Sequence, residues 1–399
     1  MKILLVVPEY PPFNIGGGGE VFRQIAENLR DFGHQVIVVY GYHPTKNIFE
    51  KIKSYDENKI KFIQVPEIPC PKFLPFLRTV LPMNLFVKSE LTRIIKEVNP
   101  DVVNLHGYGQ FFPAQVSKIL IKLNIPYVLT LHGAPVSPGK MKGIIKIVYD
   151  FYNSRYGSPL LCQAKAITAV SKFSTTFSEF REFKTHILII NNGINIQELI
   201  EISRAEKTSI FDKYFKKESN LIFFSLGRLE WLKGFQHFIN IIPELKKQGY
   251  SIKYCIGGAD NNYKSELINL IKKLNLEKDD IFLGQLDINQ KCNAYKFCDF
   301  VVVPSEVENF PAVPLEAMSL GKIPIVNDAG GIGEIVKDKY NGVICDVTDT
   351  KVFTNRVLEI IRDNKLKKNI ENNFGDVKKY DWKNIVREYE KILQKNKKF

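Results

Sequence analysis

Short apolar runs that alternate with amphipathic segments constrain the fold of this chain more than any other feature. A parallel strand buried on both faces has a continuous apolar sequence, and the helix that returns the chain to the next strand places apolar residues three and four positions apart. One such helix is expected at EVFRQIAENLRDFG, which ends at Gly33. The expected strands of the first half are KILLVV, QVIVVY, IKFIQV, DVVNLH, YVLTLH, AITAV and ILII.

A second series of strands follows a polar connector over residues 203–220. Its expected strands are LIFFSLG, IKYCIGG, IFLG, FVVVPS, IPIVN and GVIC. Strands alternating with helices predict parallel sheets covered on both faces, so we expect an α/β chain with two doubly wound, Rossmann-like domains facing a cleft. We place the domains at residues 1–195 and 196–378. Residues 379–399 are expected to form a basic helix that packs back on the first domain.

The composition limits where this chain works and what it binds. No apolar run approaches the ~18–20 residues that a membrane-spanning helix needs, and the first residues fit a strand better than a signal peptide. Six scattered cysteines lack metal-ligand spacing, as expected for reduced thiols in the cytoplasm. The net charge of +13 fits an anionic membrane surface or a phosphorylated substrate, although a lysine-rich proteome would also produce it. No nucleic acid is expected as a partner.

The stretch ENFPAVPLEA carries two glutamates, Glu308 and Glu316, in a segment that cannot be one regular helix. Pro311 and Pro314 lack backbone N–H donors and bias the preceding residues towards extended geometry. We expect Glu308 in a loop that leaves a buried strand, and Glu316 in the first turn of a short helix that ends at Gly321. Open α/β sheets bind ligands at this carboxyl edge.

A run of four glycines follows the first strand in PPFNIGGGGE. Glycines such as Gly16, Gly17 and Gly18 at a helix start let the backbone approach an anion, although a flexible turn explains them too. A dinucleotide fingerprint needs a third glycine or alanine, but Gly16-x-Gly18 is followed by Val21 at that position. The second strand also ends without an acidic residue for a ribose. Nicotinamide and flavin cofactors are therefore disfavoured.

Two further segments join a strand to a helix with residues suited to an anion. In GRLEWLKG, Arg228 and Lys233 lie five residues apart just after a strand. Two cations placed there suit a diphosphate, because arginine forks onto phosphate oxygens and lysine acts as a point charge. In NDAGGIGEI, Gly330 and Gly331 are expected to open a helix and form a second anion site. The alternatives are a basic surface loop and an ordinary turn.

Two histidines close strands in the first half. His106 follows DVVNL and His132 follows VLTL, and each precedes a glycine. Both are expected at carboxyl ends of strands. A lone histidine there is more often structural than catalytic, but two in equivalent positions favour a functional role as strongly as a structural one.

Seven segments together resemble a known family. They are GGGGE…FGHQV, TLHG, ITAVSKF, NNGIN, GRLEWLKG, the E-x7-E of ENFPAVPLE, and GGIGEIV…NGVIC. Their order and spacing resemble retaining glycosyltransferases of the GT-B class, in the group often called family four. The resemblance spans residues 2–390 and is strongest over 221–346. The chain departs from the pattern in having four glycines where the family usually has two, and Asn309 where the family often has glycine.

The resemblance implies that the second domain binds a nucleotide-diphosphate-sugar. Arg228 and Lys233 would hold the diphosphate, Glu308 would meet hydroxyls of the donor sugar, and Glu316 would accept from the ribose hydroxyls. His132 resembles the family histidine that contacts the sugar near the transferring carbon. The full expected donor site comprises Gly16, Gly17, Gly18, Arg228, Lys233, Glu308, Asn309, Phe310, Pro311, Glu316, Gly330 and Gly331. His132, Glu308, Arg228 and Lys233 form its catalytic part.

The resemblance also implies a mechanism, in which a hexose is transferred with retention by attack from the front face. No metal or other cofactor is required, and the chain shows no aspartate pair to hold a metal. A hydrolase would need two carboxylates flanking the scissile bond, and no obvious partner for Glu308 exists in the first domain. The alternatives are a sugar-nucleotide epimerase of similar architecture, a non-catalytic homologue that binds nucleotide-sugars, and, more weakly, a dehydrogenase.

The acceptor is expected to carry a hydroxyl on a glycan, a glycolipid or a lipid-linked oligosaccharide, and a small molecule stays open as well. Two stretches favour contact with the inner face of an anionic membrane, residues 137–156 and 71–88, because both mix apolar and basic side chains. The simpler interpretation is that these stretches are surface helices that pack on the sheet or cover the acceptor cleft.

Overall fold

Two units make up the chain in the computed structural model: Met1–Asn192 joined by Trp382–Phe399, and Gly193–Asp381. We call them unit 1 and unit 2. The connector expected at residues 203–220 lies inside unit 2, so the chain changes units earlier than this polar segment. The structure describes residues 1–12, 17–42, 51–67, 85–133, 143–177, 180, 183, 186–205, 208–213, 220–277 and 280–398.

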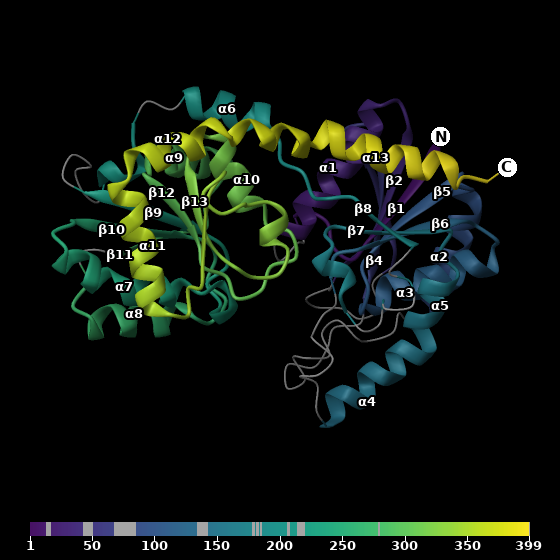
Figure 1. The fold of residues 1–399 in the computed structure, drawn as a ribbon. Coiled ribbons are helices and arrows are strands. Elements are labelled where there is room, and N and C mark those ends of the chain that lie inside the picture. The colour runs from purple at the N-terminus through teal and green to yellow at the C-terminus, as the bar shows by residue number, and fades with distance from the viewer. Residues whose placement is uncertain are drawn as a thin grey trace. The chain divides into compact units, whose positions relative to one another are not determined.

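Unit 1 is built on an eight-stranded sheet with the strand order β3-β4-β2-β1-β5-β6-β7-β8 (Figure 1). The strands are β1 (Lys2–Val7), β2 (Gln35–Tyr42), β3 (Lys53–Glu57), β4 (Ile60–Pro66), β5 (Val102–His106), β6 (Tyr127–Leu131), β7 (Ala166–Ala169) and β8 (Ile187–Ile189). All seven strands expected from the sequence are present. The unexpected β3 pairs antiparallel with β4, so the sheet is not parallel throughout.

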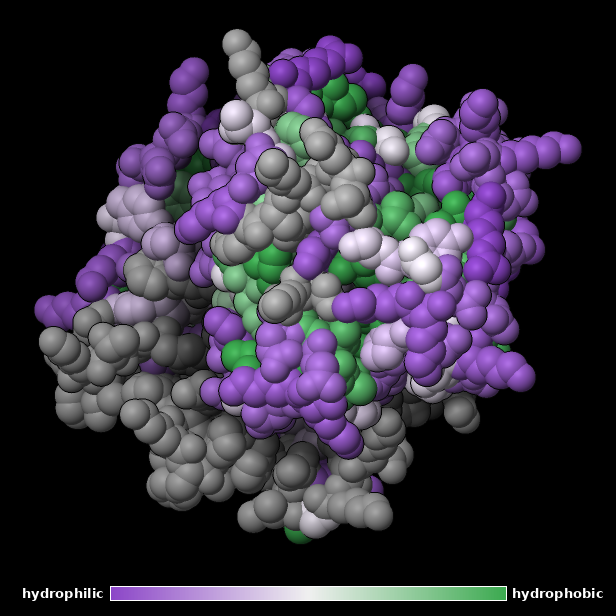
Figure 2. All heavy atoms as spheres, turned by 90° about the vertical axis from the view of Figure 1, so that its left-hand side faces the viewer, coloured by the Kyte–Doolittle hydropathy of each residue, from purple (hydrophilic) through white to green (hydrophobic). Residues whose placement is uncertain are grey.

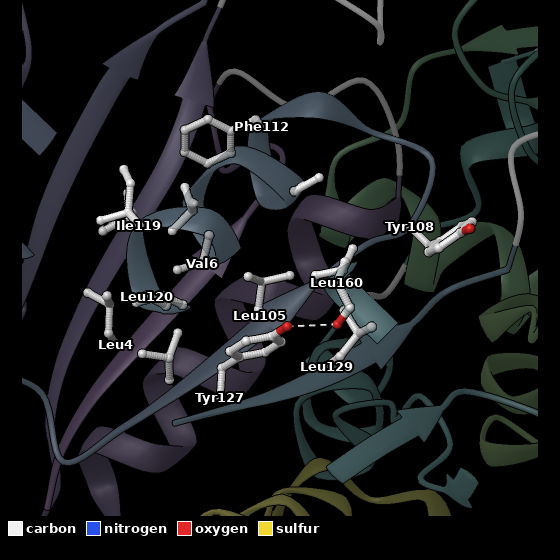
Figure 3. Packing of buried hydrophobic residues seen from close by; sticks show 14 of the residues in the cluster. Leu4, Val6, Leu105, Tyr108, Phe112, Ile119, Leu120, Tyr127, Leu129 and Leu160 are labelled. Carbon is white, nitrogen blue, oxygen red and sulfur yellow. Dashed lines mark hydrogen bonds between the residues drawn. The ribbon is translucent and has the colours of Figure 1, made fainter. Parts of the chain in front are cut away.

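Helices cover both faces of this sheet. The covering helices are α1 (Gly17–Asp31), α2 (Leu85–Val98), α3 (Phe111–Lys122), α5 (Ser158–Cys162) and α13 (Trp382–Lys395), whereas α4 (Gly143–Tyr152) projects from the unit (Figure 1). On one face, side chains of α2, α3 and α5 pack with alternate residues of the strands. Figure 3 shows this core, in which Leu4 and Leu105 lie with Ile119 and Leu120 of α3, and the Tyr127 hydroxyl donates to Leu160 O at 2.7 Å.

The other face of the unit 1 sheet is covered by α1 and α13. Trp382, Ile385 and Tyr389 of α13 lie in one cluster with Ile3 and Leu5 of β1. The chain therefore returns from unit 2 to complete the core of unit 1. Where it returns, the Ile194 amide donates to Tyr380 O at 2.9 Å, so the outgoing and returning segments are joined by a backbone hydrogen bond.

Unit 2 holds a six-stranded parallel sheet in the order β11-β10-β9-β12-β13-β14. The strands are β9 (Leu221–Leu226), β10 (Ile252–Gly257), β11 (Asp280–Gly284), β12 (Phe300–Val303), β13 (Ile323–Asn327) and β14 (Val343–Cys345), all six of them expected. The helices are α6 (Ile196–Ala205), α7 (Phe235–Lys247), α8 (Lys264–Lys273), α9 (Ile288–Phe297), α10 (Ala312–Ser319), α11 (Thr350–Arg362) and α12 (Asn364–Asn372). Both units are thus Rossmann-like α/β folds.

The surface is largely polar where Figure 2 shows it. Among the coloured residues of this face, hydrophilic side chains predominate and hydrophobic ones gather in smaller areas between them. None of the described helices combines the length and the apolar character that crossing a membrane requires.

Candidate functional site

The loop between β12 and α10 carries Glu308, Asn309, Phe310 and Pro311. Pro311 is extended and forms the N-cap of α10, as its missing N–H allows. The ring of Phe310 is buried and lies 5.6 Å from the ring of Tyr380, which anchors the loop. The Asn309 side-chain Oδ1 is buried, and no described residue donates a hydrogen bond to it. Phe310 and Pro311 therefore hold the end of this loop in place, and Asn309 Oδ1 is left as an acceptor without a donor among the described residues.

Lys233 is brought directly to Glu308. The short 3-10 helix η8 (Trp231–Lys233) follows β9, and Lys233 Nζ donates to Glu308 Oε1 at 2.6 Å. Both side chains are partly buried. Arg228 lies in the same loop after β9, but its side chain is 44% exposed and pairs with Glu230 at 3.2 Å. The two predicted cations thus sit at one carboxyl edge of the sheet, and the nearer one is already paired with the predicted sugar-binding carboxylate.

The loop after β9 and the loop after β12 come into backbone contact at Gly234. This residue has a φ of +69°, and a Cβ there would lie 2.0 Å from Pro304 O. The Glu306 amide also donates to Leu232 O at 2.9 Å. Only glycine permits this approach, so the loop that carries Lys233 is held against the loop that carries Glu308 by the backbone itself.

The loop after β13 closes on Glu308 from the other side. Gly330 has a φ of +61°, and a Cβ there would lie 2.0 Å from Glu308 O. The Gly331 amide donates to the same oxygen at 2.8 Å. The prediction that these glycines open a helix was wrong, because η9 (Ile332–Glu334) is a single 3-10 turn. The Gly331 amide is moreover used within the protein, where it supports the Glu308 loop. A role of the two glycines in donor binding stays a prediction.

Glu316 lies on α10 and is 8% exposed. The helix begins at Ala312, which places Glu316 in its second turn and corrects the expected first turn. Its Oε1 accepts from Lys291 Nζ and its Oε2 from the Tyr295 hydroxyl, both at 2.7 Å. Burial and the Glu316 charge raise the pKa of Tyr295, which keeps that hydroxyl a donor. Each carboxylate oxygen retains a second lone pair for a ligand hydroxyl.

The sequence did not reveal Lys291 and Tyr295. Both lie on α9, four residues apart on one helix face, in the stretch INQKCNAYKF. Their spacing is common to any helix, so their meeting with Glu316 depends on how α9 packs in unit 2.

The glycine run lies at the start of α1. Gly16 falls outside the described residues, and the helix begins at Gly17. A Cβ on Gly18 would lie 3.2 Å from Glu9 Oε1, which brings a carboxylate to the first turn of the helix. A carboxylate is favourable at a helix N-terminus, so Glu9 already interacts with the positive end of the helix dipole that would attract an anion. Sequence reasoning did not single out Glu9.

The two histidines meet at the carboxyl edge of the unit 1 sheet. His106 ends β5, His132 follows β6, and His106 Nδ1 lies 2.9 Å from His132 Nε2. The Phe22 ring stands edge-on to both imidazoles, with centroids 5.2 and 5.3 Å away. Burial lowers the pKa of His132 to about 4, and burial with the neighbouring His132 lowers the pKa of His106 as well. Both rings are therefore neutral near pH 7.

Comparison with known families gives matches to two sequence profiles. Residues 206–375 match the family "Glycosyl transferases group 1", and residues 15–198 match "Glycosyltransferase Family 4". The second match includes the glycine run and both histidines. The first includes the loops after β9, β12 and β13.

Individual relatives match over nearly the whole chain. An uncharacterized glycosyltransferase of Methanocaldococcus jannaschii is 28% identical, over 97% of this chain and 96% of that protein. The N-acetyl-alpha-D-glucosaminyl L-malate synthase of Bacillus anthracis is 23% identical, over 93% of this chain and 90% of that protein. Among solved structures, Anabaena HepE in complex with UDP has a TM-score of 0.73 and 20% identity, covering 99% of this chain and 100% of that one.

Proposed function

Because the chain belongs to the group 1, family 4 glycosyltransferases, we propose that it moves a sugar from a nucleotide-diphosphate-sugar to a hydroxyl acceptor, with retention of the anomeric configuration. The observation that carries the proposal is the pair formed by Lys233 Nζ and Glu308 Oε1 at 2.6 Å, with Arg228 in the same loop. A cation for phosphate and a carboxylate for sugar hydroxyls lie side by side at the ligand-binding edge of an α/β sheet.

The charges suit a reaction in which negative charge grows on the leaving diphosphate. The bond from the anomeric carbon to the phosphate oxygen breaks, and a bond from that carbon to the acceptor oxygen forms on the same face. The acceptor proton passes to the departing diphosphate. Lys233 and Arg228 stabilise the diphosphate charge, and Glu308 orients the sugar through its hydroxyls.

Preorganisation supports this assignment. Gly234 and Gly330 hold the neighbouring loops against Pro304 O and Glu308 O, so the charged groups need little rearrangement as the reaction proceeds. Asn309 Oδ1 supplies a buried acceptor to which no described residue donates, as expected where a ligand completes the hydrogen bonding.

Glu316 is assigned the ribose hydroxyls, which it accepts with the lone pairs left free by Lys291 and Tyr295. His132 is assigned a contact with the donor sugar. UDP-sugars are the first donors to test, because the UDP complex of HepE shares this fold.

For the acceptor, we propose a lipid-linked glycan reached from an anionic membrane surface. Helix α4 exposes 69% of Ile147 and 57% of Phe151, which lie one turn apart on the same helix face. The neighbouring Lys146 is exposed too, although it pairs with Asp150 at 2.5 Å. Residues 137–142 and 71–84, which complete the two stretches singled out in the sequence, lie outside the described residues.

The test is a screen of nucleotide-sugars for thermal stabilisation, followed by transfer assays on those that bind. Product analysis should show retained configuration, and turnover should continue in EDTA. Incubation with the donor alone separates the epimerase alternative, because an epimerase changes the sugar without an acceptor. If no nucleotide-sugar stabilises the protein or is consumed with any acceptor class, the proposal is wrong.

A further inference from the structure

A line of hydrogen-bonded polar side chains crosses the unit 1 sheet on the face that α1 and α13 cover. It runs through Thr168, Thr130, Asn104, His106 and His132, on β7, β6, β5 and the residue after β6. The first four are fully buried. Apolar side chains of similar size would pack on this face without the cost of desolvating polar groups. Stability therefore does not explain this line of polar side chains.

The orientation of the Asn104 amide follows from its neighbours. Its nitrogen lies 3.0 Å from Thr130 Oγ1 and 3.5 Å from Val128 O. A backbone carbonyl can only accept, so the NH2 group must face this side. The Asn104 oxygen then faces His106 Nε2 at 2.8 Å, and His106 must carry its proton on Nε2 to donate to it.

The same logic passes from one imidazole to the next. A neutral His106 with its proton on Nε2 has a bare Nδ1, which accepts from His132 Nε2 at 2.9 Å. His132 must therefore hold its own proton on Nε2. Burial supports the neutral state of both rings, since it lowers the pKa of His132 to about 4 and that of His106 as well. Among the described residues, none donates to His132 Nδ1.

We propose that Asn104 and His106 are positioning residues that fix the tautomer of His132, so that His132 presents a bare Nδ1 to a hydroxyl of the substrate. The contact with a substrate hydroxyl rests on the proposed function, whereas the tautomer of His132 does not. The arrangement assigns His132 as a hydrogen-bond acceptor, because its proton is tied to His106. It also gives α1 and α13 a role in the chemistry, since Phe22 and Tyr389 hold the His106 ring with centroids 5.2 and 6.1 Å away.

The test is nitrogen NMR of the full chain labelled with 15N-histidine. Two-bond proton–nitrogen correlations report which ring nitrogen carries the proton, and His132→Gln and His106→Gln variants assign the two rings by loss of signal. Wild-type His132 should be protonated on Nε2 and bare on Nδ1, and should stay neutral at pH 5. A proton on Nδ1 of His132 in the wild type would overturn the proposal, whatever the variants do.

Asn104→Leu supplies the second arm. Without the Asn104 oxygen, a proton on His106 Nε2 has no acceptor, so the proton of His106 moves to its Nδ1. His106 Nδ1 then donates to His132 Nε2, and the proton of His132 moves to His132 Nδ1. We expect this switch in the spectrum and a loss of about tenfold in kcat/KM for transfer, as the loss of an oriented hydrogen bond implies. If folded Asn104→Leu keeps the wild-type tautomer of His132, then Asn104 does not fix that tautomer and the proposal is refuted.

Val102→Ala is the matched control, because Val102 is buried on the same face of β5 and has no polar side-chain atom. Val102→Ala should lower thermal stability without moving the His132 proton. If Asn104→Leu and Val102→Ala each lose activity only in proportion to their loss of stability, a positioning role for Asn104 is contradicted. The NMR result stands even if no donor is turned over. A failed transfer assay with the expected tautomer therefore counts against the proposed function alone.

Discussion

Replacing Gly330 with alanine probes whether the Glu308 loop is held by the backbone contact described above. The new Cβ would lie 2.0 Å from Glu308 O, far inside van der Waals contact, and the residue would have to keep a φ of +61°. A left-handed conformation costs a non-glycine residue about 1–2 kcal/mol. Displacing Glu308 O would also break its hydrogen bond with the Gly331 amide, worth about 1 kcal/mol.

The sum is a destabilisation of unit 2 by about 2–3 kcal/mol, which lowers the melting temperature of a unit of this size by about 4–12 °C. Scanning calorimetry measures the shift, and a transfer assay should show reduced kcat because Glu308 moves. Gly333→Ala is the control, since Gly333 lies close by in the chain, has no positive φ, and would bring its new Cβ within 4 Å of no atom outside its own turn. Equal melting temperatures for the two variants would refute the reasoning.

Other changes test the roles assigned to the site and to α4. Arg228→Ala and Lys233→Ala should each reduce transfer by an amount equivalent to about 2–4 kcal/mol while leaving the fold intact, and near-normal turnover in both would contradict the diphosphate assignment. Glu316→Gln should weaken binding of the free nucleoside diphosphate in calorimetric titration, whereas Glu308→Gln should mainly lower turnover; equal effects on that binding would mean that the roles are misassigned. Wild-type protein should co-sediment with anionic vesicles in a salt-dependent way and Phe151→Asp should do so less, while equal binding to neutral vesicles would favour a soluble acceptor.

The other strands were predictable because each is a short run rich in apolar residues, and β3 was missed because it is not. All five of its residues are exposed, so KSYDE carries no alternation of buried and solvent-facing positions. It forms by pairing at the sheet edge with β4, where Tyr55 also stacks on the ring of Phe62, so its position depends on neighbouring strands and not on a local sequence pattern. The polar connector misled for a related reason, since Phe211 is buried and the Ile210 amide binds Asn293 within unit 2.

The placement of several candidate residues at strand ends was predictable, but the contacts between their side chains were not. Strand ends located Lys233, Glu308 and the histidines, because the carboxyl edge follows from parallel topology alone. The contact of Lys233 with Glu308 and the anchoring of Glu316 by Tyr295 depend on side chains from elements far apart in the sequence. The helix expected after Gly331 failed because local pattern could not distinguish a full helix from one 3-10 turn.

The return of α13 to unit 1 affects the order in which the two units can fold during translation. Ribosomes add roughly 5–20 residues per second, so the stretch Gly193–Asp381 occupies about 10–40 s between the two parts of unit 1. Throughout that time the nascent sheet lacks the apolar cover that Trp382, Ile385 and Tyr389 later provide. Unit 2, whose chain is continuous, can finish folding before unit 1 does. A premature stop before α13 would therefore harm the half of the protein that is translated first.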